Sequence, residues 1–157
     1  DEDFPPTNPT EKNDTRTTGV STADGQTWNE PESAYNAEYP FNKVMETESG
    51  HIKEFDDTEE NERIHEYHRS GTFYEIDSQG RKVTRVVNDN YEVVLGDDYL
   101  YVDGQVNITT TSKTNIFAQN DINILSNPGD MNITSSGTMT LTSATRIQLA
   151  APRIDLN

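Results

Sequence analysis

The last third of the chain, residues 106–157, alternates apolar and polar positions in a pattern that recurs every seven to nine residues. Each repeat opens on a triplet with apolar outer members and a polar middle member, Thr114 being the one weak position. The triplets are Val106-Asn107-Ile108, Thr114-Asn115-Ile116, Ile122-Asn123-Ile124, Met131-Asn132-Ile133, Met139-Thr140-Leu141, Ile147-Gln148-Leu149 and Ile154-Asp155-Leu156. The one extra residue falls in the turn sequence 127–130, which can accommodate a bulge. A regular repeat of this kind predicts one repeated structural unit.

Each triplet predicts a short β-strand with a buried side and a solvent-facing side, because alternate side chains of a strand point to opposite faces. Small residues or threonine follow at the same inward parity, at Thr110, Ala118, Ser126, Ser135, Ser143 and Ala151. We therefore expect a narrow interior formed by Val106, Ile108, Ile116, Ile122, Ile124, Met131, Ile133, Met139, Leu141, Ile147 and Leu149. The middle residues, such as Asn107 and Asn123, should face solvent.

A single copy of this repeat cannot bury its own apolar rows. A strand of about eight residues covers one thin row, whereas ordering the backbone costs about 1–2 kcal/mol per residue. Stacking against other copies supplies the missing surface and pairs every strand edge except those at the ends. The short repeat and the narrow interior favour three copies. The pattern predicts an all-β fold, an intertwined trimeric triple-stranded β-helix whose needle (residues 106–157) is a β-prism.

Residues 43–105, the collar, read as short β-strands separated by turns, and they include the start of the needle. The expected turns are Ser49-Gly50, Ser70-Gly71, Ser78-Gln79-Gly80, Asn88-Asp89-Asn90, Gly96-Asp97-Asp98 and Asp103-Gly104. Alternation is visible in residues 51–55, 73–76 and 99–102. A period of eight already links Val83, Tyr91 and Tyr99, and likewise Val86, Val94 and Val102. No stretch of the collar has sustained apolar residues at helical spacing.

Residues 1–42 form a linker or extended arm rather than a domain. They have no hydrophobic period, and five of the seven prolines lie in residues 1–40. Trp28, Tyr35, Tyr39 and Phe41 are spaced aromatics that suit an extended arm lying along another surface. Disorder is the alternative, and we expect it for residues 1–20, whereas residues 27–42 should dock.

The charge distribution excludes several partners. The chain of 157 residues has 28 acids and 12 bases, for a net charge of -16. Residues 1–105 hold all of the net negative charge, and residues 106–157 are neutral. So acidic a chain repels nucleic acid phosphates and anionic lipid surfaces. No run of 18 apolar residues predicts a transmembrane helix, and no signal peptide opens the chain. Because the chain starts at Asp1, we expect a processed product or a fragment.

No catalytic, cofactor or metal site is expected. The chain has no cysteine. His51, His65 and His68 could hold a metal in a trimer, but structural or surface histidines are the simpler interpretation. The acidic segment 56–62 lacks the spacing of a calcium loop, so we interpret it as a solvated loop with Arg63 as its local partner. Glycosidase chemistry needs two carboxylates held in a cleft, and the chain has no helical domain to form one. A Ser-His-Asp arrangement is not expected either, because the serine-rich needle lacks histidine altogether. We therefore expect that this chain is not an enzyme.

A long ordered motif precedes the repeats. It comprises Tyr39–Val44, Glu46–His51, Glu54–Thr58, Glu62–His65, His68–Thr72 and Glu75–Asp77. Together with the octads, it resembles the C-terminal needle of the central baseplate spike of contractile phage tails, the tail-associated lysozyme family. Type VI secretion spike proteins share this architecture. Two departures are the scarcity of glycine in the octads and the absence of a terminal His-x-His iron site, since the last histidine is His68.

The resemblance implies a homotrimer at the tail baseplate of a virion, forming a stiff spike that pierces the host outer membrane on sheath contraction. In the family, an OB-fold domain and often a lysozyme domain precede the needle and connect it to the baseplate hub. Alternatives are the C-terminal spike part of a tail lysozyme precursor whose upstream domain degrades peptidoglycan, and a type VI secretion spike. A tail-fibre adhesin is a further rival, although the octads leave no separate globular tip.

The apolar pattern persists to the last residues of the chain. Three copies of Ile147, Leu149, Ile154 and Leu156 would form a flat apolar platform. Exposed platforms of this kind usually mark binding sites. The resemblance implies a small conical PAAR-type tip protein as the partner, and a self-capped end with Arg153 folded over the last layer is the alternative.

Overall fold

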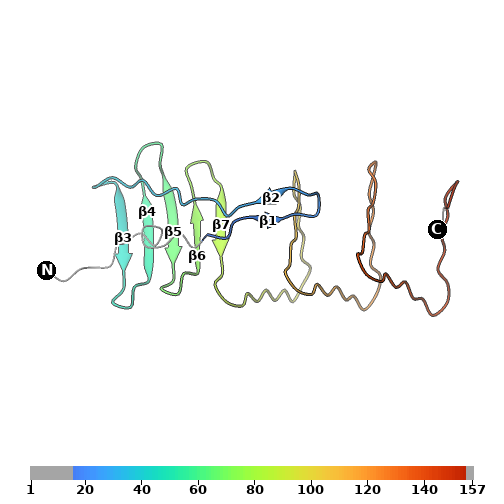
Figure 1. The fold of residues 1–157 in the computed structure, drawn as a ribbon. Helices are drawn as coiled ribbons and strands as arrows, with labels where there is room; N and C mark the ends of the chain where they lie inside the picture. Colours follow the sequence, from blue (N-terminus) through green and yellow to red (C-terminus); the bar gives the residue numbers. More distant parts are fainter. Residues whose placement is uncertain (1–15, 155–157) are drawn as a thin grey trace. The chain divides into compact units, whose positions relative to one another are not determined.

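The structure is a computed structural model that describes residues 16–154 (Figure 1). Within that range every regular element is a β-strand, so the expected all-β class is confirmed and no helix could cross a bilayer. Leu156 and most of residues 1–20 lie outside the described residues. The chain divides into two compact units, one ending at Lys113 and the other beginning at Thr114.

The first unit is built around a five-stranded antiparallel sheet in which sequence neighbours pair in order (Figure 1). Its strands are β3 (Asn42–Glu46), β4 (Ile52–Asp56), β5 (Arg63–Tyr67), β6 (Phe73–Ile76) and β7 (Lys82–Arg85).

Three of the expected turns connect the strands of this meander. Gly50, Gly71 and Gly80 each have a positive φ, and each backbone amide donates to a carbonyl three residues earlier. Only glycine adopts this backbone conformation without steric cost, which explains why these glycines predicted the turns.

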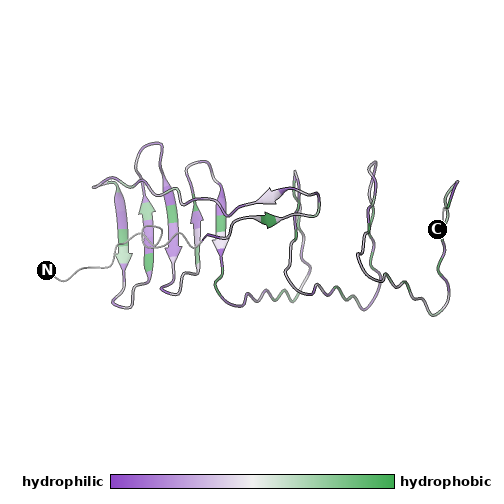
Figure 2. Cartoon of the chain, viewed as in Figure 1, coloured by the Kyte–Doolittle hydropathy of each residue, from purple (hydrophilic) through white to green (hydrophobic). Residues whose placement is uncertain are grey.

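The two faces of the sheet differ in an unusual way. The buried face carries Ile52 but otherwise polar residues, namely Glu54, Asp56, Arg63, His65 and Glu75. The opposite face is open and mixes the ion pair Lys53–Glu66 with large apolar side chains: Met45, Phe55 and Ile64 are 62%, 45% and 37% exposed. Figure 2 shows hydrophilic and hydrophobic positions interspersed along these strands. The enclosed side of the sheet is therefore ionic, and several large apolar side chains lie on its open side.

The arm consists of a small hairpin followed by an extended segment. β1 (Val20–Ser21) pairs with β2 (Thr27–Trp28) in antiparallel register. Residues 29–41 have no assigned strand, and they contact the polar face of the sheet through residues 33–38. Residues 16–20 are ordered beside this segment, because the Thr17 amide donates to Glu30 Oε2 at 2.8 Å.

Residues 86–154 form no strand within the single chain, so β-structure of the collar is found only as far as Arg85. The expected core side chains of this stretch are all exposed, between 47% for Met139 and 80% for Ile108. A strand ladder needs a neighbouring strand to satisfy its N–H and C=O groups, and one copy of the repeat offers none. The repeat has therefore not buried its apolar rows within one chain.

Candidate functional site

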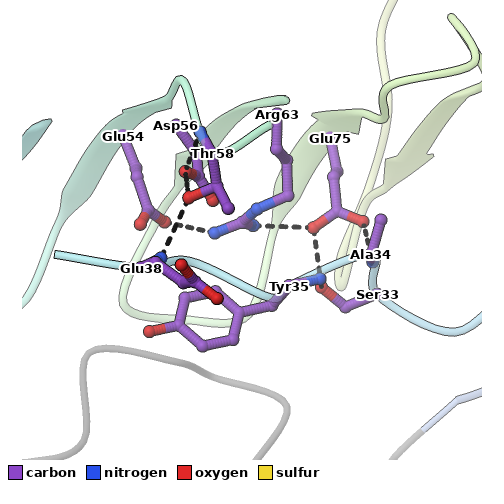
Figure 3. Close-up of polar contacts among 9 residues, drawn as sticks. All are labelled: Ser33, Ala34, Tyr35, Glu38, Glu54, Asp56, Thr58, Arg63 and Glu75. Atoms are coloured by element: carbon purple, nitrogen blue, oxygen red, sulfur yellow. Dashed lines mark hydrogen bonds and ion pairs between the residues drawn. The ribbon is translucent and has the colours of Figure 1, made fainter. Parts of the chain in front are cut away.

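The centre of the buried sheet face is an ion-pair cluster around Arg63 (Figure 3). Register places Arg63 on β5 opposite Asp56 on β4, with Glu54 and Glu75 on the same face. The Arg63 guanidinium pairs with Glu54 Oε2 through Nη2 and with Glu75 Oε2 through Nη1, the latter at 2.8 Å. All three side chains are at most 5% exposed. The guanidinium thus bridges two carboxylates that would otherwise be buried without a counter-charge.

Residues 33–35 of the arm cover this cluster. The Ser33 hydroxyl donates to Glu75 Oε2 at 2.7 Å, and the Ala34 amide donates to Glu75 Oε1 at 2.9 Å. The Tyr35 ring centroid lies 5.0 Å from the Arg63 guanidinium carbon, within cation–π range. The arm therefore donates two hydrogen bonds to the Glu75 carboxylate and places an aromatic ring over the Arg63 guanidinium.

A second arm contact lies beside the first. The Glu38 amide donates to the Thr58 hydroxyl at 2.9 Å, and that hydroxyl donates to Asp56 Oδ1 at 2.6 Å. Asp56 Oδ1 also accepts from the Thr58 amide at 3.0 Å. The β4–β5 turn and the arm are consequently joined through one buried carboxylate.

The surroundings in the cluster lower the pKa of two residues, Glu75 and His65. Burial alone would raise the pKa of Glu75, but the Ala34 amide, the Ser33 hydroxyl and Arg63 outweigh it, and the pKa is lowered. Burial and the neighbouring Arg63 charge lower the pKa of His65 to about 4, against a smaller opposing effect of Glu75. At neutral pH Glu75 is therefore ionised and the imidazole of His65 is neutral.

The expected role of Arg63 was wrong. It is not the partner of a solvated acidic loop, because β5 alternation turns its side chain onto the buried face, where Glu54 and Glu75 lie. Asp56 is likewise buried rather than part of that loop. Charged residues recur at the same strand parity in positions 54, 56, 63, 65 and 75, and this pattern is the signal that could have revealed the cluster.

Among the described residues, the three histidines belong to no group of His, Asp or Glu side chains that could hold a metal ion. His65 packs against Phe73, with ring centroids 5.7 Å apart. His51 and His68 lie side by side with centroids 4.4 Å apart. Their Nδ1 atoms accept from the Arg69 and Ser70 amides at 3.4 and 3.2 Å.

The platform residues are exposed in the second unit. Ile147, Leu149 and Ile154 are 51%, 61% and 47% exposed, and Leu156 lies outside the described residues. Within one chain, neither these residues nor the expected trimer core come together in a buried cluster. Their apolar surface remains available to other copies or to a partner.

Comparison with known proteins relates the chain to phage spike proteins. Protein Gp5 of Vibrio phage KVP40 is 51% identical over 72 residues, which are 46% of this chain and 17% of that protein. The pre-baseplate central spike protein Gp5 of Enterobacteria phage T4 is 47% identical over 64 residues, 41% of this chain and 11% of that protein. The chain thus spans less than a fifth of the length of these relatives, and no protein-family model matches it. The resemblance inferred from the sequence is confirmed: the chain is homologous to part of a phage baseplate central spike protein.

Proposed function

We propose that this chain is the needle and collar of a central spike at the baseplate of a contractile phage tail, where it acts as a cell-puncturing device. The observation that carries the proposal is the exposed repeat of residues 106–154, which follows a collar whose own interior is already closed by its arm. Similarity to the pre-baseplate central spike protein supports the place of the chain in the virion.

The needle is a homotrimer in this proposal. Burying an isoleucine or leucine side chain fully contributes about 1.5–3 kcal/mol. The eleven core positions expected from the repeat are all exposed in one copy, so association would recover this contribution along the whole needle. The open face of the sheet, with Met45, Phe55 and Ile64, offers further apolar surface to neighbouring copies. Intertwined copies would also pair the backbone groups of residues 86–154.

Mechanical function follows from such a trimer. Continuous ladders of strands with no open edge along the shaft resist bending, and sheath contraction supplies the force that drives the needle through the host outer membrane. The acidic collar repels the anionic groups of that membrane and limits adhesion. The N-terminal side would connect to the OB-fold or lysozyme portion of the spike and, through it, to the baseplate hub.

The end of the needle receives a tip protein of the PAAR type. The support is the apolar pattern of the last repeats, in which Ile147, Leu149 and Ile154 are exposed. Deletion of residues 147–157 should abolish binding of the tip protein while leaving the trimer intact, as measured by sedimentation and by pull-down. Unchanged affinity of the tip protein for the truncated trimer would refute this assignment.

The chain itself has no catalytic role in this proposal, and any peptidoglycan hydrolysis belongs to other parts of the spike. Its buried carboxylates support this assignment, because Glu54 and Glu75 are engaged by one guanidinium rather than facing a cleft. The purified chain should therefore release no soluble fragments from peptidoglycan. Hydrolysis by the purified chain would contradict the purely structural role.

A further inference from the structure

The β1–β2 hairpin reaches from the sheet to the start of the needle (Figure 1). Its base is fixed by Glu30, which is buried, accepts from the Thr17 amide at 2.8 Å and pairs with Arg85 of β7 at 3.4 Å. Its turn is closed by Asp24, which accepts from the Thr22 hydroxyl and, at 3.2 Å, from the Gln26 amide. The base of the hairpin is thus held by Glu30, and its turn is stabilised by Asp24.

Two side chains donate to this hairpin, one directly before the first needle repeat and one within it. Gln105 Nε2 donates to Asp24 Oδ2 at 2.8 Å, and Thr109 Oγ1 donates to the Ser21 carbonyl at 3.1 Å. These contacts join positions 81 and 88 residues apart in the sequence. Gln105 and Thr109 have the same parity in an extended chain, and it is opposite to that of Val106 and Ile108. The hairpin therefore occupies the side of this segment that the expected core residues do not use.

The sequence specifies the strand register unevenly here. Val106 and Ile108 favour one face, but residues 109–112 read Thr-Thr-Thr-Ser, so a slip by one residue in that stretch would exchange side chains of nearly equal size and polarity. Such a slip turns every side chain of a strand to the other face. An external contact that accepts only one parity would remove this ambiguity where the needle begins.

We propose that the β1–β2 hairpin is a register clamp that seats on the outward side of the first repeat and holds Val106 and Ile108 toward the interior. The inference rests on the proposed trimeric needle. The partner of the hairpin is a segment of its own chain, residues 105–109. A two-stranded hairpin is at best marginally stable in water by itself, so its order depends on these contacts and on Glu30.

The clamp is tested by hydrogen exchange in the full-length assembly with matched substitutions. Gln105→Glu removes the amide donor and places a second carboxylate beside Asp24, and Thr109→Val removes the hydroxyl at constant shape. The controls are Gln148→Glu and Thr140→Val, the same changes at outward positions farther along the needle. The amides of Thr22 and Gly25, which close the hairpin turn, should exchange at least tenfold faster in the first pair and unchanged in the second. Equal exchange in all four variants would overturn the clamp.

A crosslink tests which chain the hairpin contacts. The sequence has no cysteine, so Asp24→Cys combined with Gln105→Cys introduces the only two thiols per chain. A short thiol-specific crosslinker should join them within one chain, giving a single-chain band in a denaturing gel and a crosslinked peptide pair from that band in mass spectrometry. Bands of two or three chains, or no crosslink, would overturn the assignment. Sedimentation of the untreated wild type is measured separately: a monomer there would refute the proposed trimer, whereas a trimer without the single-chain crosslink refutes the clamp alone.

Discussion

Replacing Arg63 tests whether the buried ion cluster organises the collar. Arg63→Met keeps a long side chain but leaves the carboxylates of Glu54 and Glu75 buried without their cation. Removing one partner of a buried ion pair typically costs about 3–5 kcal/mol, because the remaining charge stays desolvated. Here two carboxylates lose their partner, and the Tyr35 ring loses a cation–π contact worth about 0.5–2 kcal/mol. We expect a loss of at least about 3 kcal/mol per chain in the free energy of unfolding.

The matched control is an ion pair on the open side of the same strands. Lys53 and Glu66 lie 3.5 Å apart, with side chains 44% and 51% exposed. Exposed pairs contribute about 0–1 kcal/mol, so Lys53→Met should be nearly silent. Both variants are compared by urea unfolding at one fixed chain concentration, since the apparent stability of an oligomer depends on concentration.

A compensated variant separates charge from packing. Arg63→Met combined with Glu54→Gln and Glu75→Gln removes all three charges and should recover a large part of the lost stability. If Arg63→Met is no more destabilising than Lys53→Met, or if the triple variant recovers nothing, an unpaired buried charge is not the cause and the reasoning is refuted.

Two further predictions concern pH and register. Burial lowers the pKa of His65 from 6.5 to about 4, so the unfolded chain binds the proton at a higher pH than the folded chain does. The contribution of the neutral imidazole to the free energy of unfolding is therefore complete above about pH 6.5. It decreases by up to about 3 kcal/mol per chain as the pH falls to 4. His65→Phe should abolish this part of the pH dependence in urea titrations, whereas the exposed His68→Phe should retain it; equal profiles in both variants would contradict the assignment. In the needle, Ile124→Asp should dissociate the trimer, because it places three charges near one axis at several kcal/mol each, whereas Asn123→Asp should leave it intact. Equal weakening of the trimer by both substitutions would show that the register is wrong.

The repeat and the turns could be predicted from the sequence because both depend on local patterns. A glycine that must adopt a positive φ marks a turn wherever it stands, and Gly50 and Gly71 confirm this. The period of the needle is visible without any knowledge of its packing, since each triplet repeats the same alternation of apolar and polar residues. The trimeric arrangement of those triplets remains a prediction, because one chain contains only one of the surfaces involved.

Strand parity places the charged residues on one face, but their pairing in the ion cluster could not be predicted in the same way. Charged residues are normally assigned to the solvent side of a strand, and here the enclosed side carries them. The ion pair of Arg63 with Glu75 spans 12 residues, and the Ser33 contact with Glu75 spans 42. The choice of Arg63 partner depends on strand register and on the path of the arm. Neither is encoded by local spacing, so the sequence alone favours the neighbouring acids of residues 56–62 as partners.

The mass of the purified assembly tests the central claim most directly. Sedimentation equilibrium or light scattering in neutral buffer should give three times 17.7 kDa, about 53 kDa, without dissociation on dilution. The physical reason is that the apolar rows of residues 106–154 are exposed in a single copy and need other copies to bury them. A stable species of 17.7 kDa with the circular dichroism of a folded β-protein would contradict the trimeric needle.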